Sequence, residues 1–243
     1  MRLNRTRSVL AVACLLPVAA LTACGSSTTN GTGTPAGTVP TSPAVGISGT
    51  TLRCAKPPAP AASAKQLKLP SKKAAAGKTF IAVLQTTCGN VTFELYGAKA
   101  PQTVASFLQL AKGYWDDSPC HRLTTQGIYV LQCGDPTGTG TGSPGYGFGV
   151  ENAPSDGDYP AGTVAMARGE SPDTNGGQFF VVYKDTKLPT NTGGYSIFGK
   201  VTSGMDIINA VAKAGTNSST GDGAPSQPIS ILKVTVTQKK SAA

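Results

Sequence analysis

The chain has 243 residues, 30 glycines, 18 prolines and a formal net charge of +9 at neutral pH. The excess charge lies near the N-terminus, because residues 77–243 contain twelve basic and twelve acidic residues. A nucleic-acid partner is therefore not expected, since such a partner requires a basic patch on the folded domain. The length allows one large domain or two small ones.

Residues 1–23 have the layout of a secretory signal peptide. Three arginines precede an apolar run at residues 9–20, which is too short to span a bilayer. The following Leu21-Thr22-Ala23-Cys24 resembles a bacterial lipobox, in which the cysteine is lipidated and becomes the mature N-terminus. We expect Cys24 to anchor the protein to the outer, extracytoplasmic face of the cell membrane. The alternative is an ordinary signal peptide cut elsewhere, with Cys24 incidental.

Residues 24–76 are rich in Gly, Ser, Thr, Ala and Pro and contain no aromatic residue. They show no periodic apolar pattern, so we expect a disordered tether. The pattern changes after this segment, and residues 77–240 are expected to form the folded domain.

Export implies an oxidising compartment, in which cysteines pair. Cys14 would leave with the signal peptide and Cys24 would carry lipid. The cysteines that remain are Cys54, Cys88, Cys120 and Cys133. Their three possible pairings stay open, although Cys120 and Cys133 could face each other across a hairpin. Zinc and a catalytic thiol are both disfavoured, since the chain has no C-x-x-C and a single histidine, His121.

The domain is expected to begin with a hairpin of Thr79–Thr86 and Val91–Tyr96, joined by a Gly89-Asn90 turn. Pro101 then opens a helix that ends near Gly113, since proline is tolerated at the first helical position. The apolar stripe of this helix is typical of a core-facing surface. It consists of Val104, Phe107, Leu108 and Ala111.

A second hairpin is predicted within Cys120–Asp135, which reads C-H-R-L-T-T-Q-G-I-Y-V-L-Q-C-G-D. Gly127 interrupts the run and indicates a turn between two short strands. Folding this hairpin would bring Arg122 near Gln132. A guanidinium held above an apolar surface suits a neutral carbonyl ligand better than a charged one.

Residues 134–149 carry glycines at close intervals. A phosphate-binding loop is disfavoured because no Lys-Ser/Thr pair and no helix start follow, so a surface loop is expected. Further strands are predicted at Val164–Ala167, Phe179–Tyr183, Ile197–Val201 and Ile229–Val236. Before the last of these, Ser203 and Asp206 resemble a capping box that starts a helix ending at Gly215.

Several segments resemble the cyclophilin family of peptidyl-prolyl isomerases, in the family's order, over Lys78 to Lys239. They are the H-R at His121, L-Q-C-G-D at Leu131, M-A at Met166, T-N-G-G-Q-F-F at Thr174 and F-G-K-V at Phe198. The resemblance implies a mainly β fold, a closed eight-stranded antiparallel barrel capped by two α-helices. It also implies cis–trans isomerisation of X-Pro bonds without a cofactor or a metal.

The resemblance assigns catalysis to Arg122, positioned by Gln132. The residues that it places around the substrate proline are Tyr129, Val130, Phe180, Leu188 and Tyr195. For the peptide that flanks the proline, it implies contacts with Gln178 and with the backbone of Ala167, Arg168 and Gly169. His121 is structural in family terms. The alternative for Arg122 is a salt-bridged residue on a surface strand.

Several departures from the family pattern are visible. The turn before Tyr129 is longer than usual, and Tyr129-Val130 replace phenylalanine and methionine. Leu188 replaces a tryptophan that contacts cyclosporin in many members, so we expect weak cyclosporin inhibition. Tyr195 replaces a histidine. Arg168 replaces an asparagine, and its longer side chain is expected to alter the preference next to the proline.

The leading hypothesis is a lipid-anchored prolyl isomerase that acts on proline-containing peptides and unfolded exported proteins. The alternatives are a module that docks proline peptides without turnover, and a holdase chaperone. We expect a monomer, since no apolar stripe is left without a place in the core.

Overall fold

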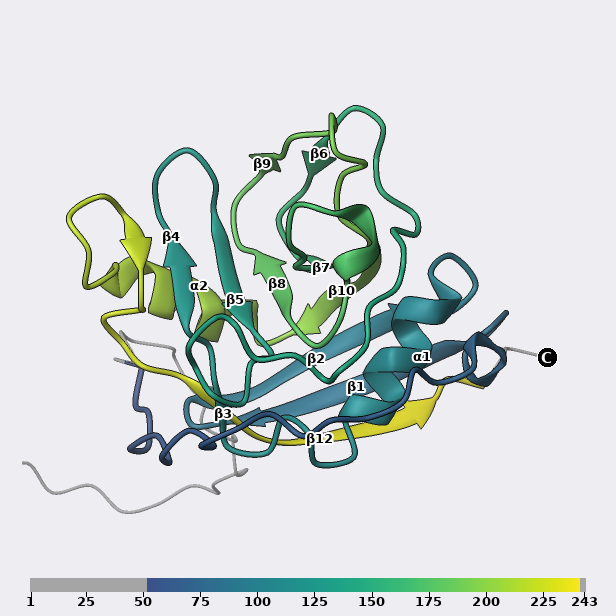
Figure 1. Ribbon diagram of the computed structural model, residues 1–243. Helices are drawn as coiled ribbons and strands as arrows, with labels where there is room; N and C mark the ends of the chain where they lie inside the picture. The colour runs from purple at the N-terminus through teal and green to yellow at the C-terminus, as the bar shows by residue number, and fades with distance from the viewer. Residues whose placement is uncertain (1–51, 241–243) are drawn as a thin grey trace, which may run out of the picture. The chain divides into compact units, whose positions relative to one another are not determined.

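A computed structural model describes residues 52–240. The signal peptide, Cys24 and the first part of the expected tether lie outside the described residues. Within residues 52–240 the fold is mainly β with two α-helices (Figure 1). No helix among these residues has the length and apolar character needed to cross a membrane.

Ten strands form one antiparallel sheet. They are β1 (Thr79–Thr86), β2 (Gly89–Tyr96), β3 (Ser118–Pro119), β4 (Arg122–Thr124), β5 (Val130–Cys133), β7 (Thr163–Met166), β8 (Phe179–Val182), β10 (Ile197–Ser203), β11 (Asp222–Gly223) and β12 (Ser230–Gln238). Their order in the sheet is β11-β4-β5-β8-β7-β10-β2-β1-β12-β3. Two short strands, β6 (Asp158–Tyr159) and β9 (Thr186–Lys187), pair separately.

The sheet curls without closing, which corrects the expected closed eight-stranded barrel. Strands β1, β2 and β12 run beneath the more upright β4, β5 and β8 (Figure 1). In the described part of the chain, no pairing joins the end strands β11 and β3. Each of these strands has only two residues, and Pro119 in β3 has no backbone N–H to donate. The sheet ends therefore offer too few backbone groups to complete a ring.

The hydrophobic core lies inside the curled sheet and is formed by alternate residues of the strands. In β1, Phe80, Ala82 and Leu84 are buried while their neighbours are more exposed, as the two-residue period of a strand requires. Aromatic rings fill the centre, where the Phe107 ring lies 4.7 Å from Trp115 between centroids. The predicted first hairpin is confirmed, with Thr86 paired to Gly89. Its turn is Thr87-Cys88, however, because Gly89 and Asn90, which were predicted as the turn, already begin strand β2.

Helix α1 (Pro101–Leu110) ends three residues before the predicted Gly113, where a turn with φ of 92° follows. Ala100 provides no side-chain cap. Glu151 supplies one from a distant loop instead, since its carboxylate accepts from the backbone N–H of Gln102 at 3.0 Å and of Thr103 at 2.8 Å. An anion at this end of the helix satisfies orphan donors and complements the helix dipole.

Helix α2 (Met205–Ala214) differs from the prediction at its start. The N-cap is Gly204 with φ of 89°, and no side chain caps the helix. The expected capping box of Ser203 and Asp206 is therefore wrong, because Ser203 still belongs to strand β10. At the other end, Gly215 is the C-cap, as predicted. Two 3-10 helices, η1 (Lys72–Ala74) and η2 (Pro172–Thr174), complete the helical elements.

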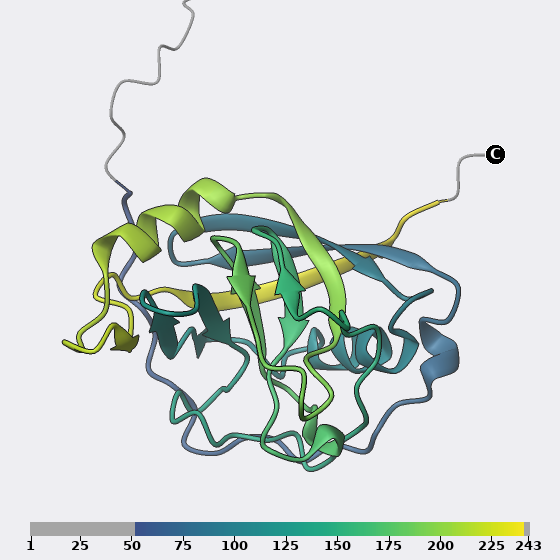
Figure 2. The same ribbon diagram turned by 90° about the horizontal axis from the view of Figure 1, so that it is seen from above.

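The structure differs from the prediction of a disordered tether at residues 52–76. This segment, called the N-terminal strap below, lies along the domain and runs past α1 into β1 (Figure 2). Its backbone pairs with the domain at several points, for example Ala55 N with Thr87 O at 2.7 Å. Leu67 and Ala64 also pack against the core. The sequence of the strap shows no periodic apolar pattern because these contacts use backbone groups and single apolar residues.

The four remaining cysteines form two disulfides. Cys54 of the strap pairs with Cys88 at the β1–β2 turn, and Cys120 pairs with Cys133 across the β4–β5 hairpin. These pairs select one of the three pairings that the sequence left open. The first disulfide attaches the strap, and the second braces the hairpin that carries Arg122.

Candidate active site

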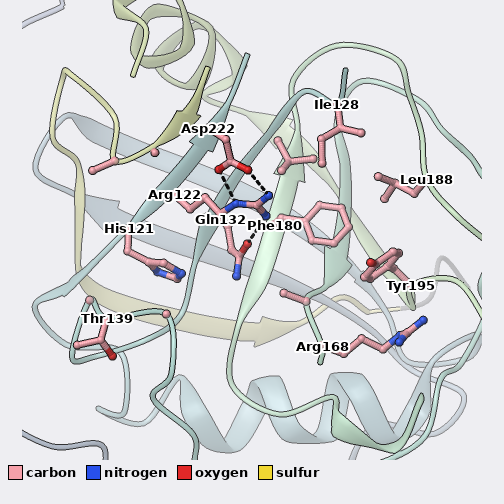
Figure 3. A pocket seen from close by; sticks show the side chains of 16 residues that line it. His121, Arg122, Ile128, Gln132, Thr139, Arg168, Phe180, Leu188, Tyr195 and Asp222 are labelled. Carbon is pink, nitrogen blue, oxygen red and sulfur yellow. Dashed lines mark hydrogen bonds and ion pairs between the residues drawn. The ribbon is translucent and has the colours of Figure 1, made fainter. Parts of the chain in front are cut away.

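The hairpin of β4 and β5 places Arg122 opposite Gln132, as predicted. Gly127 sits in the turn with φ of 72°, a conformation that favours glycine. The Arg122 Nη1 donates to Gln132 Oε1 at 3.1 Å (Figure 3). Because the two residues are direct cross-strand partners, the strand pairing itself sets the position of the guanidinium.

A third residue, Asp222, holds the same guanidinium. It comes from β11, which pairs with β4, and its two carboxylate oxygens accept from Arg122 Nε at 2.8 Å and Nη2 at 2.7 Å (Figure 3). This two-point contact raises the pKa of Arg122 and lowers the pKa of Asp222. Sequence reasoning missed Asp222. The available signal was that it is the only acidic residue in the loop at 216–227.

The Arg122 guanidinium therefore has three of its five N–H groups bonded, two to Asp222 and one to Gln132. One N–H on Nη1 and one on Nη2 remain for a ligand. The ion pair is the contact foreseen in the alternative reading of Arg122 as a salt-bridged strand residue. Here, however, the paired arginine also lines a cavity.

That cavity has a volume of about 480 Å³ and is called the proline cavity below, after the ligand that the family resemblance predicts for it. Its apolar side is formed by Ile128, Val130, Phe180, Leu188 and Tyr195 (Figure 3). The Phe180 ring is buried and meets the Tyr195 ring edge-on, with 5.7 Å between centroids. Arg122, Gln132 and Asp222 lie on the polar side. The arrangement combines an apolar hollow with a fixed donor at its rim.

Tyr129 does not line the proline cavity, which corrects its predicted role. Its ring packs on Tyr183 with 6.0 Å between centroids, and the Lys184 ammonium lies 4.3 Å from its centre. Successive strand residues point to opposite faces, so Ile128, Val130 and Gln132 share the cavity face. Tyr129 and Val130 could therefore not both line the cavity, and only Val130 does.

A second cavity of about 340 Å³ adjoins the first and is called the flanking cavity. The two share Gln132, Gly140, Ala167 and Arg168. Gly169 and Gln178 line the flanking cavity, as the prediction for peptide-flanking contacts suggests. Gln132 Nε2 donates to Gln178 Oε1 at 2.9 Å, and Gln178 Nε2 donates to Gly140 O at 2.9 Å. One hydrogen-bonded chain thus runs from Asp222 through Arg122 and Gln132 to the glycine-rich loop.

The glycine-rich loop, residues 134–149, is organised around Asp135, which is fully buried. Its carboxylate accepts from the backbone N–H of Thr137, Gly140 and Gly142, at 2.8, 2.7 and 3.0 Å. Burial alone would raise the pKa of Asp135, but these hydrogen bonds outweigh it and hold the pKa below its ordinary value. A Cβ at Gly142 would collide with the carboxylate, so this position requires glycine.

Arg168 is held by carbonyl oxygens rather than by a carboxylate. Its guanidinium donates to Gly194 O at 2.9 Å and to Thr192 O at 2.8 Å, and it lies over the Tyr195 ring at 4.9 Å from the centroid. The side chain therefore ties the loop after β7 to the segment before β10. This extensive anchoring leaves the Arg168 charge at the junction of the two cavities.

His121 lines the rim of the proline cavity without a polar contact. Its Nδ1 is buried and has no hydrogen-bond partner within residues 52–240. Burial lowers the pKa of His121, which keeps the imidazole neutral near pH 7. No group of three His, Cys, Asp or Glu side chains in the described part is arranged to hold a metal ion.

Comparisons with known proteins identify a family for this chain. Residues 81–236 match the family model for cyclophilin type peptidyl-prolyl cis-trans isomerase/CLD. A probable peptidyl-prolyl cis-trans isomerase B of Mycobacterium tuberculosis is 40% identical over 197 residues, which is 74% of this chain and 63% of the relative. The chain thus spans less than two thirds of that relative's length. A mouse peptidyl-prolyl cis-trans isomerase-like 1 is 40% identical over 156 residues, which is 62% of this chain and 88% of the relative.

Solved structures give the same result. A cyclophilin type peptidyl-prolyl cis-trans isomerase of Cryptosporidium parvum aligns with a TM-score of 0.55 and 30% identity, covering 67% of this chain and 99% of that one. The same protein was solved in the presence of the dipeptide Ala-Pro, with a TM-score of 0.54 and 30% identity over 65% of this chain and 99% of that one. The match to the family model covers more than half of the chain, so the chain belongs to the cyclophilin family of peptidyl-prolyl cis-trans isomerases.

Proposed function

We propose that this protein accelerates cis–trans rotation about X-Pro peptide bonds. The observation that carries the proposal is a guanidinium, Arg122, fixed from two sides at the rim of an apolar cavity. The Cryptosporidium protein solved with Ala-Pro has the same fold, which supports a proline-containing ligand. Family membership supports the reaction type.

Rotation about an X-Pro bond crosses a barrier of about 18–20 kcal/mol, because amide resonance must be broken. The enzyme must therefore bind the twisted amide more tightly than either planar isomer. In our proposal, Phe180 and its apolar neighbours hold the proline ring away from water. The two remaining N–H groups of Arg122 donate to the neighbouring carbonyl oxygen and approach the proline nitrogen.

The pairing with Asp222 favours a neutral ligand. An arginine whose charge is balanced by a carboxylate attracts anions weakly, yet its N–H groups still donate. The pair is also pre-organised, since Asp222 and Gln132 grip opposite sides of the guanidinium. A donor that needs no reorganisation during the reaction is an effective source of transition-state stabilisation.

The test is the cis-to-trans rate of a prolyl tetrapeptide with the full-length protein and its Arg122→Ala variant. We expect turnover that falls about a thousandfold in the variant, the upper range for removing one such donor. Turnover that the substitution leaves unchanged would support the isomerase activity but would show that Arg122 is not its catalytic residue. Binding without turnover in the wild type would favour a proline-docking module or holdase.

We further propose that the protein is lipidated at Cys24 and assists the folding of exported proteins. The lipobox-like segment and the two disulfides support this, since disulfides persist in oxidising compartments. Growing cells with a radioactive fatty acid tests the anchor. Label on the wild type that disappears in Cys24→Ala is expected, and label that survives the substitution contradicts the proposal.

A further inference from the structure

The N-terminal strap lies outside the matched family region, residues 81–236, yet it is attached along much of the domain. The Cys54–Cys88 disulfide and the bond from Ala55 N to Thr87 O fix its first end. Its later part follows α1, where Gln109 and Gln102 donate to the carbonyl oxygens of Lys68 and Pro70, both at 2.9 Å. The strap is therefore a fixed part of the folded unit.

Between these two ends, the strap bonds to the glycine-rich loop. Ala61 N donates to Pro136 O at 2.9 Å, near the start of the loop. Leu67 N donates to Pro144 O at 2.7 Å, and Gln66 Nε2 donates to Ser143 O at 3.1 Å. The strap thus contacts the loop on both sides of its central part, residues 138–142.

That central part forms one wall of the site. Gly140 lines both cavities, and Thr141, Gly142 and Ser143 line the flanking cavity. Pro144 lies next to this wall, close to Gly176 and Gly177, which also line the flanking cavity. A chain segment so rich in glycine loses much conformational entropy when it is ordered, so it needs external fixation.

We propose that the strap is a positioning element of the peptide-binding site. It holds the glycine-rich loop in the shape that forms the flanking cavity, with Gln66 and Leu67 as the positioning residues and the Cys54–Cys88 disulfide as their anchor. The ligand class is a peptide that extends beyond the X-Pro pair. This inference rests on the proposed function for its ligand, but it concerns binding rather than turnover.

The proposal predicts unequal effects on the two cavities. The apolar side of the proline cavity comes from strands and from segments that the strap does not bond. Loosening the strap should therefore weaken binding of peptides that reach the flanking cavity and leave short proline peptides unaffected. Successive residues of an extended chain are about 3.3–3.6 Å apart, so a hexapeptide extends about 13 Å further than a capped Ala-Pro dipeptide and is the ligand expected to reach the flanking cavity.

The experiment uses the full-length protein with three changes: Gln66→Ala, the double change Cys54→Ser with Cys88→Ser, and Lys65→Ala. Lys65 is the matched control, since its Nζ donates to Gly113 O beyond α1 and not to the loop. Dissociation constants for a capped Ala-Pro and for a hexapeptide around the same Ala-Pro are measured by titration. KM and kcat are measured for the hexapeptide.

We expect Gln66→Ala to weaken hexapeptide binding about fivefold, the order of one lost hydrogen bond, with kcat unchanged. The double cysteine variant should weaken it at least as much, while Lys65→Ala and all dipeptide values stay at wild-type levels. Equal weakening for both peptides, or an effect of Lys65→Ala as large as that of Gln66→Ala, would overturn the proposal. So would unchanged hexapeptide binding in both strap variants.

The same data separate this proposal from the proposed activity. Wild-type protein that binds the hexapeptide without turning it over would refute the isomerase, while the pattern of dissociation constants would still decide the role of the strap. Wild-type protein that binds neither peptide would overturn both.

Discussion

The proline cavity and the flanking cavity share Gln132, Gly140, Ala167 and Arg168, and the glycine-rich loop lines both, but only the proline cavity is lined by apolar side chains from β5 and β8. Around the proline cavity, β4, β5 and β8 set side chains by strand register. Beside the flanking cavity, a glycine-rich loop is shaped by one buried carboxylate, Asp135. The two cavities should therefore respond to different substitutions: the first to changes of side-chain chemistry, the second to changes that loosen the backbone.

The largest expected effect is on the loop. Asp135→Asn replaces an oxygen that accepts backbone N–H groups with an amide that donates, and we expect the free energy of unfolding to fall by about 3 kcal/mol. Urea unfolding measures this. Asp158→Asn is the control, because Asp158 is an exposed partner of Lys187 and should change stability by about 0.5 kcal/mol or less. Equal effects of the two substitutions on stability would contradict the conclusion that the Asp135 carboxylate organises the glycine-rich loop.

The same variant makes a pH prediction. The folded-state pKa of Asp135 is depressed, so its contribution to stability is complete above the unfolded pKa of about 3.9 and is lost as pH falls through the folded value. The stability difference between wild type and Asp135→Asn should therefore be constant from about pH 5 upward and shrink below about pH 4. A stability difference that grows as the pH falls would show instead that the folded-state pKa of Asp135 is raised.

On the sheet side, Arg122→Lys keeps the positive charge but loses the planar contacts to Asp222 and Gln132. We expect kcat/KM to fall about thirtyfold while the unfolding curve stays close to that of the wild type. Full turnover by Arg122→Lys would contradict this prediction, because a positive charge without the fixed planar contacts would then be sufficient for catalysis.

A smaller loss is expected for Asp222→Asn, which leaves the arginine in place but replaces one of the two acceptor oxygens with an amide and removes the negative charge. We predict about a fivefold decrease in kcat/KM, the order of one charge-assisted hydrogen bond. Asp206→Asn, in the first turn of α2 and away from the cavity, is the control. A loss of kcat/KM as large as that of Arg122→Ala would show instead that Arg122 does not function without Asp222.

The smallest effect separates two consecutive residues whose side chains point to opposite faces. Ile128→Ala should raise KM for a prolyl peptide about threefold by opening the apolar side of the proline cavity, whereas Tyr129→Ala should leave KM unchanged. Steady-state measurements on both variants check this. The reverse result would restore the role that family resemblance assigns to Tyr129.

Much of the site was predictable because its central contact is local in sequence. Arg122 and Gln132 are ten residues apart on one hairpin, and a turn with glycine between two β-rich runs is sufficient to pair them. Val130 and Phe180, which the family resemblance places around the substrate proline, line the same cavity. Asp222 was not predictable in this way, since it lies one hundred residues from Arg122 and reaches it only through the pairing of β11 with β4.

By itself, the sequence determined the family, the mainly antiparallel β architecture, the approximate positions of both helices and the central arginine. These features depend on local patterns, such as alternation, turn residues and short motifs, which are readable along the chain. The tertiary structure alone decided the open curl of the sheet, the disulfide pairing, the inward position of Ile128 and the attachment of the strap. These depend on which distant backbone groups meet, and such long-range contacts leave no period in the sequence.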